Sequence, residues 1–173
     1  MSAMRWLGAL LCMVSAQGCT RAPDVAEGAE ARRAAASSDS GFAAVQDRGR
    51  TAMGVDQYTS THRFEPLPDG GRIELQRDVA DSAGSAQIRS HMEEIARAFA
   101  AGDFQVPGFV HAREVPGTRV MAAGRSKISY RVESLPRGAA LRLSTSDRAT
   151  REAIHEFLAF QRMDHRAGMH HGQ

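Results

Sequence analysis

Lysine and cysteine are scarce in this sequence, and long apolar runs are absent. Lys127 is the only lysine among 22 basic residues, and 20 acidic residues leave a formal net charge of +2. A dedicated nucleic-acid-binding protein usually carries a clear basic excess, so nucleic acid is not an expected partner. No stretch of 18 apolar residues occurs, and we expect no helix that fully spans a membrane. The 173 residues suffice for one modest domain.

Residues 1–19 have the composition of an export signal. An apolar stretch, Trp6–Val14, follows a basic residue and precedes small and polar ones. The pair Gly18-Cys19 resembles the bacterial lipoprotein signal, in which that cysteine is acylated, although Ala16 stands where the usual pattern has leucine. We therefore expect a chain anchored in the cell envelope, with the outer membrane favoured and the domain in the periplasm. The alternative is cleavage after Ala16 and a soluble periplasmic protein.

The two cysteines do not predict a disulfide. Cys12 lies within the expected signal, so Cys19 alone remains in the mature chain. An unpaired cysteine in an oxidising compartment is best explained by acylation. The membrane, reached through lipid on Cys19, is thus the expected partner.

Residues 20–52 are rich in Ala, Ser, Gly, Asp, Glu and Arg, with Phe42 as the one aromatic residue. Such a segment buries too little apolar area to offset its chain entropy, which predicts a disordered tether. A transient helix over 26–36 is compatible with its composition. The folded domain is then expected over 53–166, and a flexible Met/His tail over 167–173.

The domain carries an internal duplication. His62–Gly70 matches Tyr130–Gly138 at a constant offset of 68, with five of nine positions identical. Each copy reads as strand, turn, strand and helix. Two copies predict an α+β fold: a two-layer sandwich with a four-stranded, mostly antiparallel sheet and two helices on one face.

Apolar periodicity assigns the elements of each copy. Alternation predicts strands over 59–65 and 72–77, and apolar stripes predict helices over 82–101 and 148–164. Residues 103–126 show no clear period and are predicted to form a long loop. The residues predicted to form the core are Ile88, Ile95, Phe99, Tyr130, Val132, Leu141, Leu143, Ile154 and Phe157.

The histidines are the main candidates for chemistry. His62 lies on the apolar side of its strand, where the second copy has Tyr130, and His91 and His155 border the helical stripes. His111 falls in the predicted loop, and His165 lies in the Met- and His-rich C-terminal region. Imidazole is the commonest metal-ligating side chain, and thioethers add a preference for copper. The alternative is that each is a hydrogen-bonded or surface histidine; Met92 is most simply core.

These features predict an envelope protein that binds a transition metal, copper or zinc, through His62, His91, His111, His155 and His165. One alternative is a structural lipoprotein without a ligand, whose wet sheet face meets an envelope protein partner. A weaker alternative is a metal-dependent hydrolase. The sequence lacks the nucleophile-elbow, zinc-protease, phosphate-loop and dinucleotide motifs, so an enzyme is not favoured.

The order of several short motifs resembles a family of small uncharacterised bacterial exported proteins. The resemblance covers 53–166 and is carried by segments spread through the domain: Met53–Gln57, Thr61–Phe64, Ile88–His91, Gly102–Phe104, Val110-His111, Pro116-Gly117 and Ile154–Leu158. Relatives often have a second histidine where this chain has Arg63, so a ligand set using both is incomplete here. Some relatives carry an automatic aspartate carbamoyltransferase label, which the short domain and the missing Ser-Thr-Arg-Thr signature oppose.

Overall fold

The computed structural model describes residues 25–167, and the expected signal, Cys19 and residues 168–173 lie outside that range. The chain divides into two compact units, residues 1–36 and 37–173. In the first, the described residues 25–36 are helical. Everything below concerns the second unit.

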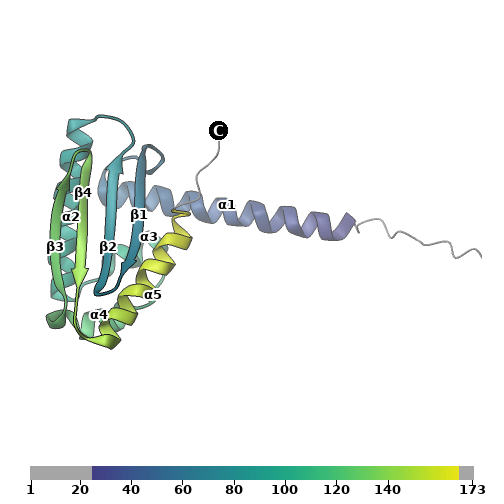
Figure 1. The fold of residues 1–173 in the computed structure, drawn as a ribbon. Coiled ribbons are helices and arrows are strands. Elements are labelled where there is room, and N and C mark those ends of the chain that lie inside the picture. The colour runs from purple at the N-terminus through teal and green to yellow at the C-terminus, as the bar shows by residue number, and fades with distance from the viewer. Residues whose placement is uncertain (1–24, 168–173) are drawn as a thin grey trace, which may run out of the picture. The chain divides into compact units, whose positions relative to one another are not determined.

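A four-stranded antiparallel sheet forms one layer of this unit. The strand order is β1-β2-β4-β3, so the two predicted hairpins lie edge to edge through β2 and β4. Figure 1 shows the four strands side by side in that order. The strands are β1 (Ser60–Leu67), β2 (Gly70–Arg77), β3 (Ser129–Leu135) and β4 (Gly138–Ser144). The α+β fold predicted from the duplication is confirmed.

Two long helices form the other layer, and each begins at an aspartate N-cap. The side chains of Asp81 and Asp147 accept hydrogen bonds from the backbone N–H groups of Gly84 and Thr150, respectively. The helices are α2 (Ser82–Ala101) and α5 (Arg148–Asp164). α2 packs mainly on β3 and β4, whereas α5 packs on β1 and β2. Each helix therefore lies largely over the hairpin of the other copy.

Most of the predicted core is buried, but its edge is not. Seven of the nine predicted residues are buried: Ile88, Ile95, Phe99, Leu141, Leu143, Ile154 and Phe157. Tyr130 and Val132 are only partly buried and pack against the core from outside. Both belong to β3, which is an edge strand with a single neighbour. One side of an edge strand stays open to solvent, which explains this difference.

Two short helices occupy the segment predicted to be a loop. They are α3 (Gln105–His111) and α4 (Thr118–Ala123), and a single 3-10 turn, η2 (Arg125–Lys127), follows them. Their sequences contain or adjoin Pro107, Gly108, Pro116 and Gly117, which obscure a helical period in so short a run. The loop prediction is therefore wrong for much of 103–126.

The segment predicted as a disordered tether also differs in the structure. Residues Val25–Met53 form helix α1, and a 3-10 turn, η1 (Gln57–Thr59), leads into β1. Val45, Gln46 and Met53 are buried, so the last turns of α1 pack on the domain. Alanine, glutamate and arginine favour helix, and a few residues at helical spacing provide the buried face. The packed structure of this unit thus begins before residue 53. None of the described helices has an apolar stretch long enough to cross a bilayer.

Candidate functional site

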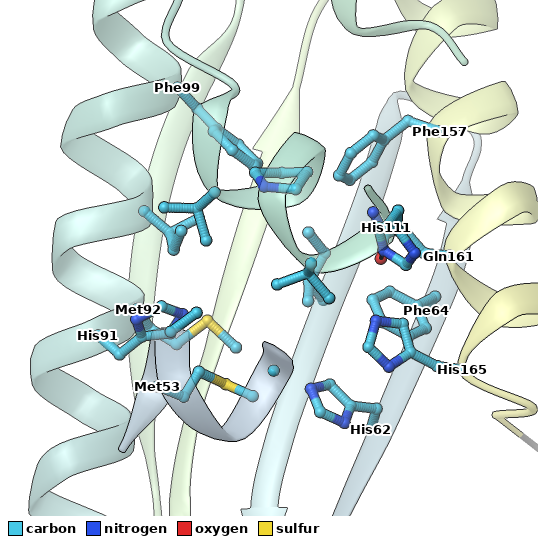
Figure 2. A pocket seen from close by; sticks show the side chains of 17 residues that line it. Met53, His62, Phe64, His91, Met92, Phe99, His111, Phe157, Gln161 and His165 are labelled. Carbon is cyan, nitrogen blue, oxygen red and sulfur yellow. Dashed lines mark hydrogen bonds between the residues drawn. The ribbon is translucent and has the colours of Figure 1, made fainter. Parts of the chain in front are cut away.

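A small cavity lies between the sheet and the helices, and four of the candidate histidines line it. Its volume is about 80 Å³, whereas pockets for drug-sized molecules run to roughly 300–1,000 Å³. The cavity therefore suits an ion with a few small ligands. Its polar and sulfur-containing lining residues are His62, His91, His111, His165, Gln161, Met53 and Met92. Figure 2 shows them around the cavity, with apolar side chains between.

His62 and His165 stack on each other at one wall of this cavity. Their ring centroids are 4.9 Å apart, with an angle of 29° between the ring planes. Phe64 packs against both rings, at centroid distances of 5.6 Å from His62 and 5.5 Å from His165. His62 thus faces the helix layer, as its position on the strand predicts, but its stacking partner comes from the end of α5.

The local structure explains why these two rings meet. His62 and Phe64 point to the same face of β1 because side chains alternate along a strand. β1 is the edge strand beneath α5, and His165 is the C-cap of that helix, with its N–H bonded to the Gln161 carbonyl. The strand period and the length of α5 together bring one imidazole from each layer to the same point.

Burial keeps both rings of the pair neutral. Burial, and secondarily the charge of His91, lowers the pKa of His62 to about 4. Burial lowers the pKa of His165 well below its usual value; His62 and His111 add to this effect, and Asp164 opposes it. Nδ1 of His165 is enclosed and has no hydrogen-bond partner among the described residues. A neutral imidazole carries a free lone pair, so both rings are competent metal ligands at neutral pH.

His111 is buried beside this pair, but its nitrogens are already engaged. Nε2 lies 2.9 Å from Oε1 of Gln161, and Nδ1 makes a short contact with the carboxylate of Asp164. Its ring meets His165 edge-on, with the centroids 5.1 Å apart. His111 therefore fixes the last turn of α5, which carries His165, and has no free nitrogen for an ion.

His91 lines the same cavity from α2, on the wall opposite His62 and His165 in Figure 2. Burial lowers its pKa, and Glu94 opposes that effect. His165, and not His91, is the stacking partner of His62. The reason is that α2 lies mainly over the other hairpin.

His155 lies outside the cavity. Its Nε2 donates to the carbonyl of Leu67, 2.9 Å away, at the end of β1. The five predicted ligands are thus not brought together. Within residues 25–167, no three His, Cys, Asp or Glu side chains are arranged to hold one ion. A set of metal ligands drawn only from these four residue types therefore has at most two members in this part of the chain.

Sequence reasoning missed two features of this site. It made Met53 only the first residue of the folded domain, and it gave neither Met53 nor Gln161 a role in the site. The spacing of Val45, Gly49 and Met53, four residues apart, was an available signal for a packed helical face.

Comparison of the chain with protein-family models, with curated proteins and with solved structures gives no match. The resemblance to small bacterial exported proteins stays a prediction.

Proposed function

We propose that this domain binds one transition-metal ion, copper or zinc, through His62 and His165. The observation that carries the proposal is the stacked pair of imidazoles at the wall of a cavity of about 80 Å³. A zinc ion requires its nitrogen ligands at about 2.0–2.1 Å, so two imidazoles sharing it have nitrogens within roughly 4 Å of each other. The two rings are stacked with centroids 4.9 Å apart, so they must turn about their side-chain torsions before the lone pairs in their ring planes can converge on one ion.

The main competing explanation is that the pair is merely part of the core. Burying a polar atom without a hydrogen bond costs roughly 1–3 kcal/mol, and Nδ1 of His165 is such an atom. An aromatic residue would fill the same space without that cost. A bound ion offsets it by accepting the nitrogen lone pair, which favours a ligand-binding role.

Titration of the untagged mature protein tests this proposal. The protein is titrated with Zn(II) in air and with Cu(I) under nitrogen, each against a coloured chelator that reports the free ion. His170→Ala and His171→Ala are included in every variant, so that tail histidines do not contribute. We expect one ion per chain.

Two single variants locate that ion. His62→Gln should weaken binding at least tenfold, because it removes one of two imidazole ligands. His155→Gln is the matched control, since His155 bonds to a backbone carbonyl outside the cavity, and it should leave the affinity unchanged. Equal effects of the two variants, or no ion bound by the parent protein, would refute the proposal.

We propose further that the protein is exported and attached to a membrane through lipid on Cys19. The support is the pair Gly18-Cys19 after a short apolar segment. Two acyl chains give a firm anchor, whereas one gives only marginal binding. Mass spectrometry of the mature N-terminus should find acylated Cys19. An unmodified chain beginning at Gln17 would contradict this expectation.

A further inference from the structure

A two-histidine site needs a further ligand, and the described residues offer few. No third His, Cys, Asp or Glu joins the pair. His111 is excluded because both of its ring nitrogens face hydrogen-bond partners on α5. The remaining donors in the cavity wall include the thioether sulfurs of Met53 and Met92.

Met53 is held at the cavity by the end of α1. Its side chain is 9% exposed and belongs to the core cluster. Gly54 follows in the left-handed conformation, with φ of 72°, and a Cβ there would lie 1.9 Å from Nε2 of Gln87. Glycine adopts this conformation without strain, so Gly54 suits the turn that follows Met53. Nε of Arg48 donates to the Val110 carbonyl at 2.7 Å, which ties α1 to α3.

Figure 2 shows where the two sulfurs lie. The Met53 side chain extends from α1 toward His62, at the same level of the cavity. Met92 comes from α2, beside His91. Both methionines are buried and belong to the core cluster, so only the direction in which each side chain extends distinguishes them. Met53 is therefore the better placed thioether.

The charge of the cavity restricts the ion it can hold. Imidazole and thioether are neutral ligands, and the carboxylate closest in sequence to His165, that of Asp164, is engaged with His111. The cost of moving an ion from water into an apolar site grows with the square of its charge. A ligand set that carries no charge of its own therefore favours a monovalent ion over a divalent one. Thioether sulfur is a soft ligand and favours Cu(I).

We infer that the site selects Cu(I) over Zn(II) and that the thioether of Met53 is its third ligand, beside His62 and His165. This inference rests on the proposed metal-binding function and narrows it to one class of ion. It also makes α1 part of the site, so that the end of this helix has a chemical role.

Matched methionine variants test the inference. Met53→Leu and Met92→Leu each remove one sulfur at nearly constant volume, and circular dichroism with thermal unfolding verifies that both variants fold. Cu(I) and Zn(II) affinities are measured by chelator competition in the full chain, with Ag(I) as a redox-inert monovalent probe. Met53→Leu should weaken Cu(I) and Ag(I) binding at least tenfold and leave Zn(II) affinity unchanged. Met92→Leu should alter none of them more than twofold.

X-ray absorption at the copper edge provides an independent readout. The parent protein should show a sulfur scatterer beside nitrogen, and Met53→Leu should lose it. Zn(II) affinity equal to that for Cu(I), or an unchanged sulfur signal in Met53→Leu, would overturn this inference and leave the proposed function intact. Absence of binding for all three ions would overturn both.

Discussion

The two halves of the domain place different rings at equivalent positions. The repeat offset relates His62 to Tyr130, and counting from the N-cap aspartates of α5 and α2 relates His165 to Phe99. The histidines stack at 4.9 Å, whereas Phe99 and Tyr130 meet edge-on at 6.2 Å. Both pairs join an edge strand to the helix above it. The scaffold therefore does not require histidine at this position.

The chemistry available in the two halves also differs. Burial raises the pKa of Tyr130, so its phenol stays protonated and offers no anionic ligand. Its hydroxyl, like Nδ1 of His165, is buried without a hydrogen-bond partner among residues 25–167. A neutral imidazole nitrogen has a lone pair suited to a metal, but a phenol is a poor ligand until it loses its proton. The proposed ion is therefore assigned to the histidine half.

The largest expected effect lies where the two halves share their core. Phe157 packs against Phe99, with centroids 5.8 Å apart, and also lines the cavity. Phe157→Ala should lower the free energy of unfolding by about 3–5 kcal/mol, the usual cost of a large-to-small core change. Urea denaturation measures it. Met163→Ala, at an exposed position of the same helix, should stay within about 0.5 kcal/mol. A loss below about 1 kcal/mol for Phe157→Ala would show that the halves do not share this core.

The second largest effect is expected for a variant in which both halves carry the same pair of rings. The double variant His62→Tyr with His165→Phe gives the histidine half the rings of the other. Metal affinity should fall at least 100-fold, or about 2.7 kcal/mol, because both imidazole ligands are lost. The metal-free protein should remain folded with an equal or higher melting temperature. Retained metal binding would show that the ion lies elsewhere, and loss of the fold would show that the halves are not interchangeable.

The halves should also respond differently to acid. The unfolded chain protonates histidine near pH 6.5, but burial lowers the pKa values of His62 and His165 in the folded protein. Between about pH 4 and 6.5 the unfolded state therefore binds more protons, and stability falls as the pH falls. The groups facing this pair are His91, His111 and Asp164.

We expect the metal-free protein to lose about 1–2 kcal/mol of unfolding free energy between pH 7 and pH 5. Two fully buried histidines would give a larger loss, but both of these side chains are partly exposed. Urea denaturation at the two pH values measures it. The double variant His62→Tyr with His165→Phe should lose less unfolding free energy over the same pH range. An equal loss in both proteins would place the titrating groups outside the pair.

Local sequence patterns predicted the scaffold, because strands, turns and capped helices each leave a signal within a few residues. The helices predicted over 82–101 and 148–164 have these bounds in the structure. Short or weakly amphipathic helices were not predicted: α3 contains Pro107, and α1 is rich in alanine with few large apolar residues. Their stability comes from packing on other elements, which no local period reveals.

The site could be predicted only in part for a related reason. Strand alternation correctly directed His62 toward the helices. Its partner depended on which helix lies over β1, and the crossed packing of α2 and α5 is a property of the whole fold. His91 and His155 both border a helical stripe, so the sequence did not distinguish them. In the structure His91 lines the cavity, whereas His155 bonds to the backbone at the end of a strand.

The smallest expected effect concerns a residue that holds the pair without belonging to it. His111 bonds to Gln161 and Asp164, in the turn that leads to His165. His111→Asn keeps a polar side chain there but loses the imidazole ring and with it the paired contacts to Gln161 and Asp164. The His165 ring should therefore be less well fixed. Metal affinity should fall about fivefold, or about 1 kcal/mol, as measured by chelator competition.

A double-mutant cycle separates this positioning role from a general loss of stability. If His111 acts through His165, then His111→Asn should have little further effect on the residual metal affinity once His165 is phenylalanine. Both single variants and the double variant are titrated in the same way. Additive losses would mean that His111 influences the ion by another route, because two changes that act on the same ligand cannot each remove its full contribution.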